Sequence, residues 1–170
     1  MGSLLDEGRL PVTAVACAGC GWTVHGGTAG CRARFEALLA RDFADSRFFA
    51  VHRTFVDCYS LQHPDDYCVS AKSLAAHLVG LAQIIDGAAG AATGSPELRR
   101  WLDGNRALEK PPLPTDRGAI TLGDIEGIED PAEWREAVRG WVQSIWSAYG
   151  DLHGVARNWA TEAGRSGGKR

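Results

Sequence analysis

The segment of residues 16–31 restricts the possible folds of this chain more than any other. It is rich in glycine, has few large apolar side chains and contains the sequence Cys17-Ala-Gly-Cys20-Gly. A segment of this composition buries too little apolar surface to fix its own backbone, so another interaction has to order it. Two cysteines separated by two residues, with a third at Cys31, provide soft ligands for a metal ion. The sequence therefore predicts an N-terminal metal knuckle over residues 17–31.

Zinc is the metal that this ligand set favours. Zn²⁺ takes cysteine sulfur readily and normally binds four ligands in a tetrahedron. Cys31 stands where we expect a helix to begin, and the helix dipole favours a thiolate there. The fourth ligand is not fixed by the local sequence, and we take it to be His52. The other candidates are His25, His63, His77 and His153. A water molecule in the fourth position would make the site catalytic, whereas a protein ligand would make it structural. No organic cofactor is indicated.

Charge and hydropathy exclude several classes of partner. The 18 basic and 21 acidic residues give a net charge of -3, without the basic excess that phosphate contacts require. The longest apolar stretch, residues 74–85, is well short of the ~20 residues that cross a bilayer. The first ten residues contain no apolar signal segment, so we expect a cytoplasmic protein with reduced cysteines. We expect a small-molecule ligand or substrate and neither nucleic acid nor a membrane as partner, and the oligomeric state stays open.

Apolar residues recur at helical spacing along most of the chain. They predict helices over residues 31–43, 50–63, 70–86, 95–102 and 130–159. Pro64 ends the second helix, and Gly150 and Gly154 allow a break in the last. No strand pattern is found, and residues 110–130 are expected to cross the helices as an extended segment.

The predicted fold class is therefore all-α. We expect a small bundle of four or five helices with an N-terminal Gly/Cys-rich zinc knuckle. A single helical domain spans residues 17–163, with a flexible lead-in over residues 1–16 and a flexible basic tail over residues 164–170. The tryptophans and the tyrosine at residues 141–149 are expected to pack in the core of this bundle.

Several polar side chains on these helices suggest acid–base chemistry. An imidazole can transfer a proton near neutral pH, and a carboxylate can orient it. Each histidine alone is better explained as a hydrogen-bonded core residue than as a ligand or a base. Buried imidazoles need partners, however, so several of them on helices that pack together favour convergence. Arg53 and Asp57 are spaced for an ordinary ion pair within a helix. The candidate catalytic residues are Asp57, Tyr59, His63, His77 and His153.

The order and spacing of these motifs over residues 17–159 resemble those of an uncharacterised, largely actinobacterial family, a domain of unknown function. The motifs are C-x-x-C-G from Cys17, a cysteine that opens the next helix, V-H-R-x-x-x-D-x-Y-x-x-Q-H-P from Val51, S-x-x-x-H-L from Ser73 and W-x-x-x-x-W-x-x-Y-x-x-x-H from Trp141. The family pattern often has a second histidine where this chain has Leu152. The resemblance implies a functional polar set, and it implies no established activity.

Two functions are compatible with these residues. The first is a zinc-binding enzyme of secondary metabolism that acts on a small organic molecule, as a hydrolase, lyase or cyclase, with an acid–base pocket between helices. The alternative is a zinc-stabilised binding or regulatory protein without catalysis. A bundle in which histidines from several helices share one ion is a third arrangement. The position of the metal distinguishes them, because three cysteines with one protein histidine favour the non-catalytic protein.

Overall fold

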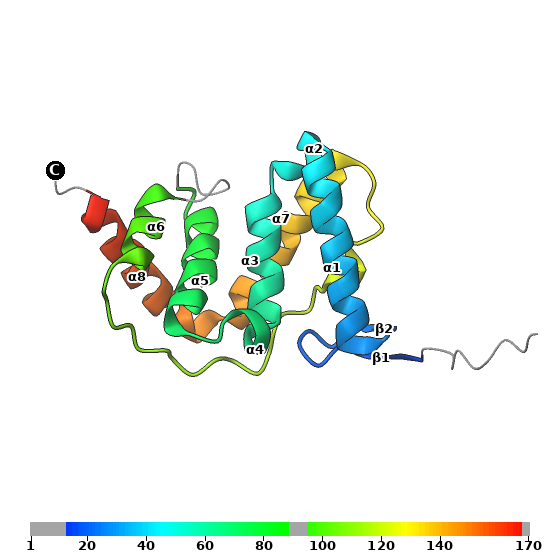
Figure 1. Cartoon of the computed structure of the whole chain (residues 1–170), viewed down its shortest axis with the longest axis horizontal. Coiled ribbons are helices and arrows are strands. Elements are labelled where there is room, and N and C mark those ends of the chain that lie inside the picture. Colours follow the sequence, from blue (N-terminus) through cyan, green and yellow to red (C-terminus); the bar gives the residue numbers. More distant parts are fainter. Residues whose placement is uncertain (1–12, 89–94, 168–170) are drawn as a thin grey trace, which may run out of the picture.

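Helices make up most of the chain (Figure 1). We describe the protein from a computed structural model, which describes residues 13–88 and 95–167. The elements in chain order are β1 (Ala14–Ala16), β2 (Thr23–His25), α1 (Gly27–Ala44), α2 (Ser46–Phe49), α3 (His52–Gln62), α4 (Pro64–Tyr67), α5 (Ala71–Ile85), α6 (Pro96–Asp103), the 3₁₀ turn η2 (Leu122–Asp124), α7 (Pro131–Ala148), the 3₁₀ turn η3 (Gly150–Leu152) and α8 (His153–Gly167). The prediction of a helical fold class is confirmed.

The helix ends follow from residues that satisfy free backbone groups. The hydroxyl of Ser70 accepts a hydrogen bond from the backbone amide of Ser73 at the start of α5. The hydroxyl of Ser73 accepts one from the backbone amide of Ser70, which completes a capping box. Asp130 accepts from the first turn of α7, and Pro131 occupies its first position, where no amide donor is needed. These caps explain why α5 and α7 begin close to the residues predicted from the sequence.

The N-terminal segment differs from the prediction. Residues Ala14–Ala16 and Thr23–His25 pair as a short antiparallel hairpin, in which Val15 lies opposite Val24. Strands of three residues are too short to show an alternating pattern, and only Val24 among these six residues is buried. Residues 14–16 of the expected lead-in therefore form a strand, and its residues 1–12 lie outside the described part of the chain.

The C-terminal half contains the break that the glycines allow. The η3 turn separates α7 from α8 at Gly150. Helix α8 continues to Gly167, so the tail expected from residue 164 onward is helical over its first four residues. Residues 168–170 lie outside the described part. Residues 104–121 run without helix or strand between α6 and η2, so the segment of residues 110–130 that we expected to be extended contains the turn Leu122–Asp124.

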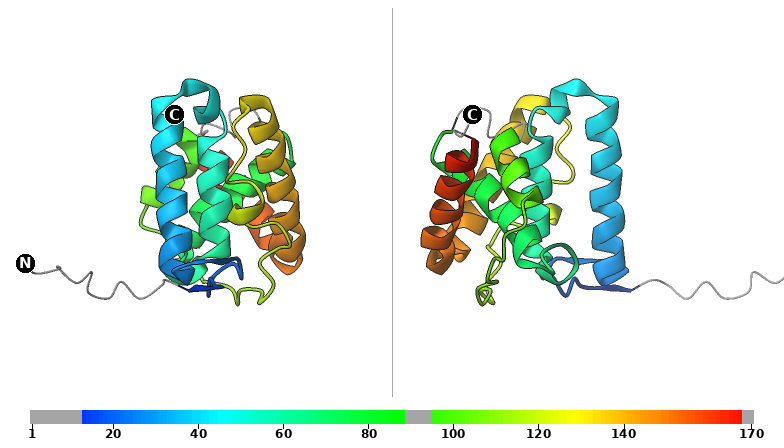
Figure 2. Two further views of the ribbon diagram at one scale, coloured as in Figure 1. Left: turned by 90° about the vertical axis from the view of Figure 1, so that its right-hand side faces the viewer. Right: turned by 60° about the vertical axis from the view of Figure 1, so that its left-hand side comes forward.

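Helix α3 is central to the packing. It contacts α5 on one side, α1 on the other and α7 behind, while α5 also packs against α6 and α8. Figure 2 shows α1 at one edge of the molecule, with the β1–β2 hairpin beneath its first turn. Trp141 and Tyr149 are fully buried and Trp146 is 6% exposed, which confirms their predicted place in the core. Among the described helices, none has the length and apolar character that a membrane crossing requires.

Gly30 holds α1 close to the hairpin. A Cβ atom at this position would lie 1.8 Å from the backbone oxygen of His25, so the Gly30→Ala variant has to move α1 away from β2. We expect a loss of about 1–3 kcal/mol in the free energy of unfolding, as for other overpacked sites. Chemical denaturation measures this loss.

Gly164 in α8 provides the control. No atom lies within 4 Å of a Cβ built there. Gly164→Ala should stabilise the protein by up to ~1 kcal/mol, because alanine is the better helix former. Equal effects of the two variants would contradict the close packing of α1 on the hairpin.

Candidate metal centre

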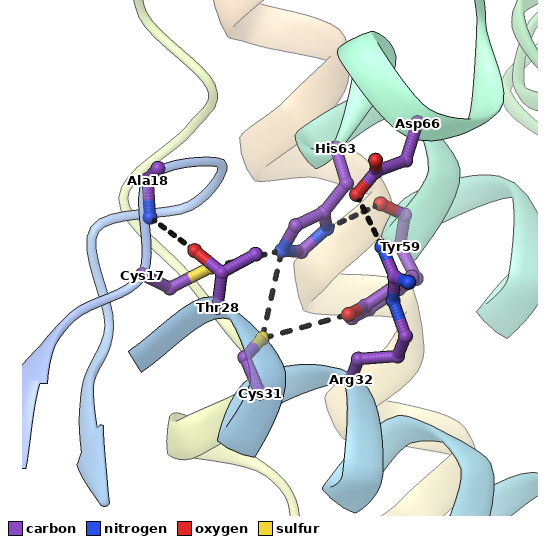
Figure 3. A network of polar contacts seen from close by, with 8 residues as sticks. All are labelled: Cys17, Ala18, Thr28, Cys31, Arg32, Tyr59, His63 and Asp66. Carbon is purple, nitrogen blue, oxygen red and sulfur yellow. Dashed lines mark hydrogen bonds and ion pairs between the residues drawn. The ribbon is translucent and has the colours of Figure 1, made fainter. Parts of the chain in front are cut away.

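The loop between β1 and β2 forms the metal knuckle. The backbone amide of Cys17 donates to the carbonyl of Trp22, and the amide of Gly21 donates to the carbonyl of Cys17, both at 2.8 Å. Gly21 has a φ of 80°, a conformation that favours glycine. The amide of Ala18 also donates to the Thr28 hydroxyl at 3.0 Å, which ties the loop to α1 (Figure 3). This turn directs Cys17 and Cys20 toward the same point.

Two further ligand groups come from helices. Cys31 lies in the second turn of α1 and is fully buried. His63 follows the last residue of α3, where its backbone leaves the helical conformation ahead of Pro64. Figure 3 shows the imidazole of His63 between the knuckle and α1, with Cys17 and Cys31 facing it from two sides. Gly19 permits this approach, because a Cβ there would lie 2.3 Å from Cδ2 of His63.

The four side chains have the spacing of a tetrahedral site. The ligand atoms of Cys17, Cys20, Cys31 and His63 all lie within 4.8 Å of one another. Sγ of Cys20 is 3.9 Å from Sγ of Cys31, and Nε2 of His63 is 3.4 Å from Cys17 Sγ and 3.5 Å from Cys31 Sγ. With zinc bonds of about 2.3 Å to sulfur and about 2.0 Å to nitrogen, the edges of a tetrahedron are about 3.8 Å and about 3.5 Å. These three separations agree with those edges, and the remaining pairs lie within 4.8 Å.

The surroundings of His63 fix which nitrogen faces the cysteines. Nδ1 lies 2.8 Å from the carbonyl oxygen of Tyr59, so it carries the proton and donates to that oxygen. Nε2 then presents its lone pair to the sulfurs. The ring of Tyr59 stacks on His63 with centroids 3.9 Å apart, and Phe35 stacks on the other face of Tyr59 at 3.7 Å. This stack holds the imidazole in one orientation.

The electrostatics of the cluster favour a thiolate at Cys20 and a thiol at Cys31. The hydrogen bond from Cys31 lowers the pKa of Cys20 to about 4, and the same bond, together with burial, raises the pKa of Cys31. Burial lowers the pKa of His63, but hydrogen bonds to the Cys20 sulfur and to the Tyr59 carbonyl oxygen outweigh it and raise the pKa overall. Burial raises the pKa of Tyr59, whose hydroxyl donates to Cys31 Sγ at 3.7 Å. Tyr59 is therefore a neutral donor to a ligand sulfur.

His52, predicted as the fourth ligand, lies elsewhere. It begins α3, whereas His63 follows the end of the helix, and eleven residues of helix correspond to about 16 Å. Nδ1 of His52 is 3.3 Å from Oδ2 of Asp42, whose carboxylate is fully buried, and the ring contacts the exposed Phe43 and Phe49, which also contact each other. Desolvation raises the pKa of Asp42 in spite of this contact. The fourth ligand position is corrected from His52 to His63.

The five candidate catalytic residues do not form one pocket. Tyr59 and His63 belong to the cysteine cluster. Asp57 and His77 meet between α3 and α5, with Nδ1 of His77 2.8 Å from Oδ1 of Asp57. His153 begins α8, where its ring stacks on Trp146 and its Nε2 lies 2.7 Å from the carbonyl oxygen of that residue. The structure thus separates them into three places.

The sequence patterns did not predict two features next to these residues, the buried carboxylate of Asp42 and the close approach of Gly80 to Asp57. No periodicity in the sequence distinguishes Asp42 from a solvated carboxylate, although it is buried. Gly80 interrupts an apolar helical stretch, and this was a usable signal. A Cβ at Gly80 would lie 2.3 Å from Oδ2 of Asp57, so glycine makes room for the buried carboxylate.

Comparisons with known proteins give a family and no activity. Residues 15–150 match a family of unknown function, DUF5946. The matched segment includes the hairpin, all four residues of the cysteine cluster and both Asp57 and His77. No curated protein and no solved structure matches the chain.

The metal content of two variants tests whether His63, at the end of α3, or His52, at its start, is the fourth ligand. We expect His63→Ala to lose its metal, because an alanine leaves three sulfurs without the fourth ligand. His52→Ala should keep the metal of the wild type, although it loses the contact with Asp42. Elemental mass spectrometry on protein purified without added metal measures both. A metal-free His52→Ala beside a loaded His63→Ala would contradict the assignment.

Proposed function

This chain belongs to the family of unknown function DUF5946, and we propose that its cluster of Cys17, Cys20, Cys31 and His63 binds one zinc ion as a closed structural site. The observation that carries this proposal is the mutual spacing of the four ligand atoms. Three thiolates and one imidazole in a tetrahedron match the preference of Zn²⁺. We therefore favour a zinc-stabilised helical protein whose metal is not catalytic.

The ligand count argues against chemistry at the metal. A catalytic zinc has three protein ligands and keeps a fourth position for water or substrate. Here a fourth protein group stands within bonding range, and three of the four side chains are buried. The zinc would instead join three segments that are far apart in sequence, namely the hairpin loop, α1 and the end of α3.

A second candidate function is acid–base chemistry at Asp57 and His77, apart from the metal. The Asp57 side chain is 2% exposed, and it also accepts hydrogen bonds from Arg53. The His77 side chain is 18% exposed. Because Nδ1 of His77 donates to the carboxylate, Nε2 carries a lone pair directed away from it. A small-molecule enzyme of this family would use His77 as the base and Asp57 to orient it.

Removal of one cysteine tests the zinc site. Cys20→Ala should lose about one zinc per chain and more than about 4 kcal/mol of stability, as expected when a structural metal is lost. X-ray absorption of the wild-type protein should show three sulfur neighbours and one nitrogen neighbour around zinc. A water oxygen in place of the nitrogen would overturn the closed site, and a wild type without metal would overturn zinc altogether.

Cys68→Ala is the matched control for this experiment. Cys68 is also buried, its Sγ donates to the carbonyl oxygen of Ser60, and burial raises its pKa to about 12. It lies outside the cluster. We expect this variant to keep its zinc and to lose only about 1 kcal/mol through the small cavity.

The second candidate has its own test in the stability of two variants. Asp57→Asn leaves the partly exposed Arg53 without its anionic partner and puts an uncharged amide in the buried position of the carboxylate, so we expect a loss of about 1–3 kcal/mol in the free energy of unfolding. His77→Gln, whose amide can still donate to Asp57, should cost less than about 1 kcal/mol. If His77→Gln is as destabilising as Asp57→Asn, the imidazole is a structural partner of the carboxylate and the candidate loses its support.

A further inference from the structure

A cavity of about 100 Å³ lies between α3, α5 and α6, apart from the cysteine cluster. The residues that line it are Arg53, Ala76, Ser95, Leu98, Arg99 and Leu102. We propose that this cavity binds the anionic group of a small molecule, a phosphate or a carboxylate, between the guanidinium groups of Arg53 and Arg99. The proposal concerns a different site from the zinc cluster and does not depend on the metal.

Arg53 is held in place before any ligand arrives. Its Nε donates to both carboxylate oxygens of Asp57 at 2.9 and 3.0 Å, and one of its terminal nitrogens, Nη2, donates to the carbonyl oxygen of Ala76 at 2.8 Å. Within residues 13–88 and 95–167, no acceptor is bonded to the other terminal nitrogen, and the side chain is 33% exposed. A guanidinium fixed in this way offers a donor to a ligand with little further loss of side-chain entropy.

Arg99 supplies a positive charge without a partner in the described chain. Its neighbour Arg100 pairs with Glu97 at 3.0 Å, and the second oxygen of Glu97 accepts from the hydroxyl of Ser95 at 2.8 Å. The acid nearest to the cavity on α6 is thus already engaged. No described carboxylate forms an ion pair with Arg99, which is exposed.

The charge balance around the cavity favours an anion. Arg53 and Arg99 contribute two positive charges, and Asp57, which bonds to Arg53, offsets one of them. One net positive charge remains to face the cavity. The planar fork of a guanidinium matches the oxygens of a carboxylate or a phosphate. Both kinds of ligand share this chemistry.

The other walls limit the size and character of the ligand. The side chains of Ala76, Leu98 and Leu102 are apolar, and the volume has room for one anionic group with few additional atoms. Arg53 also connects the cavity to His77, because both side chains bond to Asp57. A small organic acid or phosphate ester bound here would therefore lie next to the carboxylate that orients His77.

An NMR titration of the full-length protein tests this site. Sodium phosphate and, separately, sodium acetate are added at constant ionic strength to ¹⁵N-labelled protein, with sodium chloride as the reference. We expect saturable shifts of the amides of α6 and of the Arg53 side chain, with a millimolar dissociation constant. The anion that binds more tightly identifies the ligand group. Absence of saturation with both anions would overturn the proposal.

Variants at two adjacent arginines distinguish anion binding in the cavity from nonspecific attraction of anions to positive charge. Arg99→Gln should weaken binding by about tenfold or more, which corresponds to about 1.4 kcal/mol for the loss of one charge-assisted contact. Arg100→Gln removes the same charge one residue away, outside the cavity, and should change the dissociation constant by less than about twofold. Equal effects of the two variants would overturn the site. The zinc content of both variants should equal that of the wild type, whatever the outcome for zinc itself.

Discussion

The contact among three thiols and one imidazole is the constraint on which the N-terminal part of this structure depends. The knuckle, α1 and the end of α3 meet at Cys17, Cys20, Cys31 and His63. Apolar packing there is sparse, because the hairpin contributes only Val24 to the core besides its cysteine. Helix α1 also begins at a glycine without a side-chain cap. Metal coordination would supply the free energy that burial and capping do not.

Buried charge forms a second set of constraints along α3. Asp57 is satisfied by Arg53 from its own helix and by His77 from α5, while Asp42 of α1 faces His52. A buried carboxylate is tolerated only when it is paired and hydrogen-bonded. These pairs fix how α1 and α5 sit against α3, and they explain why the histidines of this chain do not converge on one ion.

The separation of the two sites has a consequence for function. Asp57 precedes His63 by six residues, which is about 9 Å along the axis of α3 and a different face of the helix. The cysteine cluster holds the end of α3 on one side. The array of Arg53, Asp57 and His77 lies on the other, beside the cavity at α6. Helix α3 thus connects the cysteine cluster at its end with a polar array whose outer ends reach solvent.

The sequence by itself determined the helical fold class, the main helices and the three cysteine ligands. These depend on local information: apolar periodicity, caps such as Ser70 and Asp130, and the C-x-x-C spacing. The choice of His63 over His52 was decided only by the tertiary structure. Both histidines fall on one stripe of the helix predicted over residues 50–63, so periodicity treats them alike, and what separates them is which end of α3 meets the knuckle. The hairpin, the burial of Asp42 and the position of Arg99 beside Arg53 likewise depend on contacts between residues distant in sequence, which no local pattern encodes.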